Sequence, residues 1–301
     1  MTKRARASRS TGRRDETRLG ERGPTTTYGA WGRAWGLLRL CHPFPSLLVT
    51  AVVCAIVPLA DRSPSAALWI QLGLGLLCFL GAFGAANDVV DATGDAASKL
   101  WKPIPSGRVS RRTATAVATL LAGAGMIVTG SLPLGAWLVG AAGLGCGLIY
   151  DFGLNRTRWS WLPMSIALPL VPIWVWLAVG AWSGLLWWAL PIGMLLGFAL
   201  HLVNQAPDVT EDVRAGKRGA AHAMGEGRAL RLGLAVWGAA ASTATVVLIF
   251  AAPSRAGLTA AAAAIALILS ARAVRVFGRD GVFGVLATTS AIIAGVFLSA
   301  A

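Results

Sequence analysis

Apolar stretches long enough to cross a lipid bilayer recur along the whole chain, and this repetition limits what the chain can fold into. About 20 helical residues cover the roughly 30 Å of bilayer hydrocarbon. Nine stretches come close to that length, at residues 44–60, 66–86, 113–132, 134–150, 161–180, 182–203, 229–251, 256–274 and 281–300. Links as short as Leu132-Pro133-Leu134 imply helical hairpins. The sequence therefore predicts an all-α integral membrane protein with nine transmembrane helices in one bundle around a central cavity.

Composition agrees with a membrane protein. Of the 301 residues 55% are hydrophobic and only 13% are charged, which excludes a typical soluble domain. The four cysteines show no CxxC spacing and lie in or beside apolar runs, so we interpret them as reduced packing residues and not as a zinc or disulfide framework.

The distribution of Lys and Arg predicts the orientation. All but two of the 27 fall before the first apolar stretch or in alternate loops, and the exceptions are Arg62 and Arg255. Basic loops stay on the cytoplasmic side of a membrane. We therefore expect a multi-pass protein of the cell inner (cytoplasmic) membrane, with its N-terminus in the cytoplasm and, after nine spans, its C-terminus outside.

The first 33 residues differ from the rest of the chain. They are polar, carry nine basic residues and show no apolar periodicity. We interpret residues 1–33 as a disordered basic cytoplasmic arm that touches anionic lipid, and residues 34–301 as the nine-helix transmembrane domain. The net charge of +14 follows the positive-inside pattern, so no nucleic-acid partner is expected.

Two acidic clusters follow long apolar stretches, at residues 87–95 and 204–212, and they hold six of the 13 acidic residues. Charge at membrane depth is costly, which makes these residues functional candidates. Both clusters repeat oxygen-bearing side chains at 0, +4 and +8, a spacing that lines one helix face and suits Mg²⁺. The two sets are Asn87, Asp91 and Asp95, and Asn204, Asp208 and Asp212.

The acidic clusters lie at helix C-termini, where the helix dipole disfavours negative charge, so they need a nearby cation. Bound metal or neighbouring basic side chains would supply it. Two Mg²⁺ ions between facing clusters would clamp a diphosphate and neutralise its charge as it leaves. The basic residues beside the clusters fit this interpretation, and they are Lys99, Lys102, Arg156, Lys217 and Arg218. A diphosphate whose other half stays in lipid is a prenyl diphosphate.

Two longer motifs resemble those of a known family. Asn87-Asp88-x-x-Asp91-x-x-x-Asp95, followed by Lys102-Pro103-Ile104-Pro105-Ser106-Gly107-Arg108, resembles the first signature of UbiA-type intramembrane prenyltransferases. Asp208-x-x-x-Asp212-x-x-x-Gly216-Lys217-Arg218 is similar to the second. Tyr150 begins a weaker third element. The resemblance covers about residues 36–300.

The resemblance implies a role for each matching residue. Asn87, Asp88, Asp91 and Asp95 would hold one Mg²⁺, and Asp208 and Asp212 the other. The catalytic carboxylates would be Asp88, Asp91, Asp208 and Asp212. The diphosphate or acceptor would contact Lys99, Lys102, Arg108, Tyr150, Arg156, Asn204, Lys217 and Arg218.

Two positions depart from the family pattern. Asn155 stands where family members often carry Lys, and Arg156 or Arg158 would replace its charge. Gln205 stands where an Asp is common, which weakens one metal ligand. Asp151 adds an acid without an assigned role. We interpret His42 as a packing or interfacial residue, His201 as a core residue and His222 as a loop residue.

The function predicted from these observations is Mg²⁺-dependent transfer of a prenyl group from a prenyl diphosphate to a small acceptor through an allylic carbocation. The resemblance favours an aromatic or quinone precursor as acceptor. Alternatives within the fold are a terpene cyclase and a transferase from a ribose diphosphate to polyprenyl phosphate. A cation-coupled transporter is the alternative from another class, although its acids would lie nearer mid-bilayer.

Overall fold

The protein folds as a bundle of long helices. The computed structural model describes residues 28–97, 99–214, 218–276 and 280–301, and the regular elements in these ranges are all helical. The long helices are α2 (Pro43–Ala60), α3 (Ala66–Asp95), α4 (Arg111–Val128), α5 (Leu134–Asp151), α6 (Leu162–Val179), α7 (Leu186–Gln205), α10 (Glu226–Ala251), α11 (Pro253–Val276) and α12 (Asp280–Leu298). The short ones are α1 (Ala30–Leu40), η1 (Leu154–Arg156), α8 (Val209–Arg214) and α9 (Ala220–Met224).

Each of the nine predicted stretches forms a helix, which confirms the all-α membrane fold. Within the described ranges, eight of these helices are long and apolar enough to cross a membrane. The helix outside that group is α4, which begins with Arg111 and Arg112 and is markedly less apolar than its neighbours. The count of nine spans and the sides of the two termini stay predictions. Residues 1–27 of the predicted arm lie outside the described residues, and α1 begins at Ala30, before the predicted boundary at residue 33.

The helix that carries the first acidic cluster is longer than predicted. α3 extends to Asp95, nine residues beyond the apolar stretch, so the cluster lies on the last turns of a continuous 30-residue helix. The second cluster does not share this geometry. α7 ends at Gln205, Asp208 lies in a turn and Asp212 lies in α8. Pro207 lacks a backbone N–H and disfavours helix before it, which explains the break. The expectation that the second cluster lines one helix face is therefore wrong.

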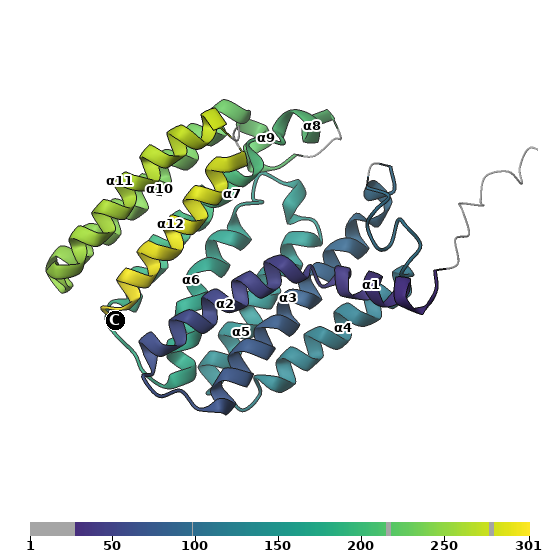
Figure 1. Cartoon of the computed structure of the whole chain (residues 1–301), viewed down its shortest axis with the longest axis horizontal. Coiled ribbons are helices and arrows are strands. Elements are labelled where there is room, and N and C mark those ends of the chain that lie inside the picture. Colours follow the sequence, from purple (N-terminus) through teal and green to yellow (C-terminus); the bar gives the residue numbers. More distant parts are fainter. Residues whose placement is uncertain (1–27, 98, 215–217, 277–279) are drawn as a thin grey trace, which may run out of the picture.

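The long helices form two groups that α7 connects (Figure 1). One group contains α1 to α6, and the other contains α10, α11 and α12. The segment with α8 and α9 lies at the upper end of the bundle in this view, and the C-terminus lies at the opposite end. The α3–α4 loop lies at the right of this view, on the same upper right side of the molecule as α8 and α9.

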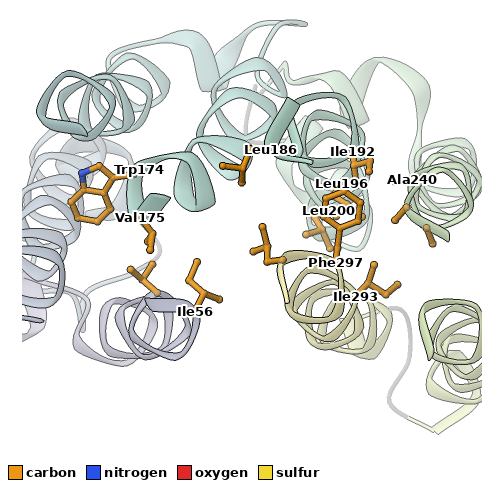
Figure 2. Close-up of a cluster of buried hydrophobic side chains, with 14 of the residues drawn as sticks. Ile56, Trp174, Val175, Leu186, Ile192, Leu196, Leu200, Ala240, Ile293 and Phe297 are labelled. Atoms are coloured by element: carbon orange, nitrogen blue, oxygen red, sulfur yellow. The ribbon is translucent and has the colours of Figure 1, made fainter. Parts of the chain in front are cut away.

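The main core lies between the two groups of helices. Figure 2 shows Phe297 and Ile293 of α12 against Leu196 of α7, and Ile56 of α2 near Val175 of α6. These side chains belong to one buried cluster that spans five or more helices. The core therefore joins N-terminal and C-terminal helices.

Close helix packing and an apolar exterior both suit a bilayer. At Gly197 of α7 an added Cβ would lie 2.6 Å from the Met164 carbonyl oxygen and 2.6 Å from Ser165 Cα, so α6 and α7 touch through their backbones. Small residues allow such contacts between membrane helices. On the outside, Ile127 and Phe250 are 80% and 85% exposed. Apolar surface of this kind is normal in lipid and unfavourable in water.

Candidate functional site

The first acidic cluster is held together by a lysine. Asp88 and Asp95 are buried near the end of α3. Lys102 Nζ lies 2.9 Å from Asp88 Oδ1 and 2.6 Å from Asp95 Oδ2. Burial alone would lower the pKa of Lys102, but its hydrogen bonds to Asp95 and Asp88 raise the pKa above its usual value. The lysine is therefore the cation that the carboxylates require at a helix C-terminus.

The chain after α3 folds back so that Lys102 returns to the helix. The backbone N–H of Lys99 donates to the Asp95 carbonyl oxygen at 2.7 Å, and the N–H of Lys102 donates to the Lys99 carbonyl oxygen at 3.0 Å. Pro103 accepts from the N–H of Val109 at 3.2 Å, which closes the loop. These turns place Lys102 beneath the cluster and leave Lys99 on the surface, 3.3 Å from Asp95 Oδ1. The sequence correctly placed both lysines beside the cluster.

Asn87 and Asp91 face the loop after α5. Asn87 Nδ2 donates to Asp151 Oδ1 at 2.8 Å and lies 3.5 Å from Asp91 Oδ2. On the other side of Asp91, Arg156 Nη2 lies 3.5 Å from its Oδ1. Asn155 stands where family members often carry Lys, and the sequence predicted that Arg156 or Arg158 supplies the missing positive charge. Arg156 lies beside the cluster, where it can do so. The fully buried Asp151 gains a role here as the partner of Asn87.

In the second cluster, Asn204 and Asp208 are exposed and Asp212 is partly buried. Asp212 Oδ2 lies 3.1 Å from His222 Nε2 of α9. The other ring nitrogen of His222 accepts from the Gly219 backbone N–H at 2.8 Å. The histidine therefore links Asp212 to the start of α9.

Tyr150 lies at the end of α5 and contacts residues of α7. It is the penultimate residue of α5, its ring meets that of His201 edge to face at 6.3 Å, and it lies beside the Gln205 side chain. Tyr150 therefore links the end of α5 to the end of α7, through His201 and Gln205.

Two predicted substrate-binding residues, Arg108 and Arg218, show no contact with the acidic clusters among the residues that the structure describes, and a third, Lys217, lies outside those residues. Arg108 Nη1 donates to the Trp101 carbonyl oxygen at 3.3 Å, and its guanidinium stacks on Tyr28, away from the carboxylates. Arg218 is exposed and lines an open groove of about 670 Å³ together with Arg156 and His222. The predicted contacts of these three with substrate stay predictions.

The side chains of the first acidic cluster are of the kind that binds Mg²⁺, although the described residues do not form a complete set of metal ligands. Among the described residues, no three His, Cys, Asp or Glu side chains converge in a geometry that would hold a metal ion. Yet Asp88 Oδ2 and Asp151 Oδ2 are buried and find no hydrogen-bond partner within the described part of the chain. Buried carboxylate oxygens without partners, on the same helix end as the partly exposed Asp91 or bonded to it through Asn87, are the hard-oxygen donors that Mg²⁺ prefers. The residues present therefore fit the ion.

Two histidines interpreted from the sequence as packing or loop residues contact the acidic clusters. His42 Nε2 lies 3.4 Å from Asp88 Oδ1, and His42 is in the left-handed backbone region with φ 45°. His222 contacts Asp212, as described above. His201 is buried, as predicted, and its Nε2 pairs with Ser160 Oγ at 3.0 Å. No local signal marked His42 or His222, because each meets an Asp from a different element.

Comparison with known proteins identifies similar sequences in one family of membrane prenyltransferases. The family model described as the UbiA prenyltransferase family matches residues 47–296. Protoheme IX farnesyltransferase 1 of Pseudomonas fluorescens is 30% identical over 171 residues, which are 49% of this chain and 57% of that protein. Protoheme IX farnesyltransferase of Azotobacter vinelandii is 31% identical over 188 residues, 54% of this chain and 62% of that protein. The match thus covers less than two thirds of the length of these relatives.

Solved structures share the fold. A UbiA homolog from Archaeoglobus fulgidus bound to GPP and Mg²⁺ has a TM-score of 0.68 and 16% identity, and the match covers 88% of this chain and 99% of that one. A structure of digeranylgeranylglyceryl phosphate synthase has a TM-score of 0.68 and 13% identity, with 89% and 96% covered. At these identities the likeness shows the fold alone.

Proposed function

This chain belongs to the UbiA prenyltransferase family, and we propose from that premise that it transfers a prenyl group from a prenyl diphosphate to a small acceptor at the cytoplasmic ends of α3, α5 and α7. The enzyme acts in the cytoplasmic membrane and requires Mg²⁺. The junction of the first acidic cluster with the end of α5 carries the proposal, because Asn87 donates to Asp151 at 2.8 Å and Arg156 lies 3.5 Å from Asp91.

The residues of the site would have three roles: binding Mg²⁺, binding phosphate oxygens and receiving the substrates. Asn87, Asp88, Asp91 and Asp95 on one side, and Asp208 and Asp212 on the other, would hold Mg²⁺. The bound ions would neutralise the negative charge that develops on the diphosphate as the allylic C–O bond breaks. Lys99 and Lys102 lie beside the same carboxylates and would contact phosphate oxygens. Asn204, Arg156 and Arg218 are exposed and would receive the diphosphate or the acceptor.

Tyr150 is placed to act on the acceptor. It lies at the last turn of α5 and packs edge to face on His201. Its ring would border the reacting carbon, where an aromatic face favours a developing cation. The apolar helices around it would hold the prenyl chain and exclude water, so that the carbocation meets the acceptor first.

The names of the relatives suggest which substrates to test first. Those proteins are described as farnesyltransferases that act on protoheme IX. Farnesyl diphosphate is therefore the first donor to test. Protoheme and an aromatic quinone precursor are the acceptors that we would compare, the second because the family resemblance favours it.

The decisive experiment measures diphosphate release by the purified protein in detergent with farnesyl diphosphate and Mg²⁺, with and without each acceptor. We expect release that needs Mg²⁺ and an acceptor, and that falls at least 100-fold in Asp91→Asn and Asp208→Asn. Asp61→Asn is the matched control, because Asp61 lies in the turn between α2 and α3, where it accepts from the Ser63 backbone N–H. Its activity should equal that of the wild type.

Each other outcome has a definite meaning. Metal-dependent release without any acceptor would replace transfer by cyclisation. Release that persists in Asp91→Asn and Asp208→Asn would remove the acidic clusters from the mechanism. Failure to release diphosphate from farnesyl, geranyl and geranylgeranyl diphosphate with either acceptor would refute prenyl transfer.

A further inference from the structure

The hydrogen bonds around His222 determine which of its ring nitrogens carries the proton. Nδ1 accepts from the Gly219 backbone N–H at 2.8 Å, so it holds a lone pair. A neutral imidazole has one donor and one acceptor nitrogen, so the proton resides on Nε2. Nε2 therefore donates to Asp212 Oδ2 at 3.1 Å. The side chain of His222 is only 4% exposed, and Asp212 is 20% exposed.

The segment that carries His222 is itself anchored in the core. The backbone N–H of Ala220 donates to Ser160 Oγ at 3.1 Å, and Ser160 Oγ lies 3.0 Å from His201 Nε2 of α7. Ser160 and His201 are both buried. Two successive backbone N–H groups, of Gly219 and Ala220, are thus held by His222 and Ser160. The start of α9 is fixed to α7 and to the loop before α6.

Asp212 needs a support that Asp91 does not. Asp91 belongs to a continuous helix of 30 residues, whose backbone fixes its position. Asp212 lies in α8, a helix of six residues that follows the break at Pro207. An isolated helix of that length is unstable by itself. The carboxylate of Asp212 therefore depends on contacts from other elements.

We propose that His222 is a positioning residue for the second acidic cluster: by donating from Nε2 while Gly219 fixes Nδ1, it holds the Asp212 carboxylate in one orientation for metal binding. This inference rests on the proposed function, because Asp212 would hold Mg²⁺ there. Partners that orient a ligating side chain through a hydrogen bond commonly affect metal affinity 10- to 100-fold. His222 touches the carboxylate and not the substrate, so its effect passes through Asp212.

Two substitutions separate the two hydrogen bonds of His222. The amide nitrogen of His222→Gln can take the place of Nε2 and donate to Asp212, but the side chain no longer accepts from Gly219. The amide oxygen of His222→Asn can take the place of Nδ1 and accept from Gly219, but the donor to Asp212 is lost. His222→Gln should therefore keep the metal affinity of the wild type, and His222→Asn should keep its stability.

The experiment measures binding of Mn²⁺, as a paramagnetic substitute for Mg²⁺, in the presence of inorganic diphosphate, together with the melting temperature of each variant in detergent. We expect the half-saturating Mn²⁺ concentration to rise at least about tenfold in His222→Asn and to stay within about threefold of the wild type in His222→Gln. The melting temperature should fall more in His222→Gln. In this crossed pattern, one variant loses Mn²⁺ affinity and the other loses more stability. It would not arise if His222 only stabilised the fold, because the variant with the lower melting temperature would then also bind Mn²⁺ more weakly.

Ser160→Ala is the matched control. It removes the neighbouring anchor of Ala220 without touching Asp212, so it should lower the melting temperature and leave the half-saturating Mn²⁺ concentration within about twofold. Equal Mn²⁺ affinity in the wild type and His222→Asn would overturn the proposal, as would the absence of Mn²⁺-diphosphate binding by the wild type. Binding that shows the crossed pattern, without turnover of any prenyl diphosphate, would support the role of His222 and refute the proposed function.

Discussion

At the residue scale, Asp88 and Asp95 are two helical turns apart, so both carboxylates face the same side of α3. Lys102 reaches both of them. Two buried carboxylates without a cation would repel each other and the C-terminal end of the helix dipole. One lysine therefore compensates two acids and also fixes the loop between α3 and α4.

The first prediction concerns this lysine. Lys102→Met removes the buried ammonium that the two carboxylates share, and loss of one partner of a buried ion pair costs about 3–5 kcal/mol. We expect a clear fall in the melting temperature in detergent. Lys99→Met is the control, since Lys99 forms only a half-exposed pair with Asp95. Such a surface pair contributes about 0.5 kcal/mol or less.

The same pair of variants tests the metal assignment of Asp88 and Asp95. If these carboxylates bind Mg²⁺, the ion can replace the missing ammonium, and Mg²⁺ should raise the melting temperature of Lys102→Met more than that of the wild type. Thermal melts with and without Mg²⁺ measure this difference. An equal shift in both proteins would argue against metal binding by these two residues.

At the element scale, the distance between α6 and α7 sets the position of the second cluster. α7 carries Asn204 and Gln205 at its end, and it meets α6 at Gly197 without intervening side chains. α5 in turn positions Tyr150 and packs on α6. A change in the spacing of α6 and α7 would therefore move the two halves of the site relative to each other.

The second prediction follows from this contact. In Gly197→Ala the new methyl group would lie 2.6 Å from backbone atoms of Met164 and Ser165, which cannot move without the whole helix. Overpacking of this kind costs about 1–3 kcal/mol, so the melting temperature should fall. Gly145→Ala in α5 is the control, because its Cβ would meet nothing within 4 Å. It should be neutral or stabilising by up to about 1 kcal/mol. Equal melting temperatures in the two variants would contradict the close approach.

At the scale of the whole molecule, the basic loops and the acidic clusters share one end of the bundle, and the C-terminus lies at the other (Figure 1). The positive-inside rule assigns the basic end to the cytoplasm. The diphosphate would then enter from the cytoplasm, and its prenyl chain would extend between apolar helices.

The third prediction tests this orientation. With nine spans the C-terminus is outside, so alkaline phosphatase fused after Ala301 should be active and green fluorescent protein fused there should be dark in bacterial cells. Truncation after Val276 removes α12, and the same fusions should then show the opposite pattern. An inactive phosphatase on the full chain would show that α4 or another helix does not cross the membrane.

Much of the fold was predictable because the signals for it are local. Each apolar stretch specifies its own helix, as the agreement of all nine stretches with helices shows. The positions of Arg and Lys predict an orientation in the same local way. The spacing of Asn87, Asp91 and Asp95 also gave one helix face correctly, because α3 continues through them. The same spacing failed at Asn204, where Pro207 interrupts the helix.

Contacts between distant elements were decided by the tertiary structure. His42 and Asp88 are 46 residues apart, and Asn87 and Asp151 are 64 apart, so no periodicity relates them. The sequence by itself determined which helices form, which end carries positive charge and where the carboxylates lie along the chain, since these depend on neighbours within a few turns. Tertiary packing determined that Tyr150 of α5 meets His201 of α7 and that His222 supports Asp212, since such contacts depend on how whole elements are placed in space.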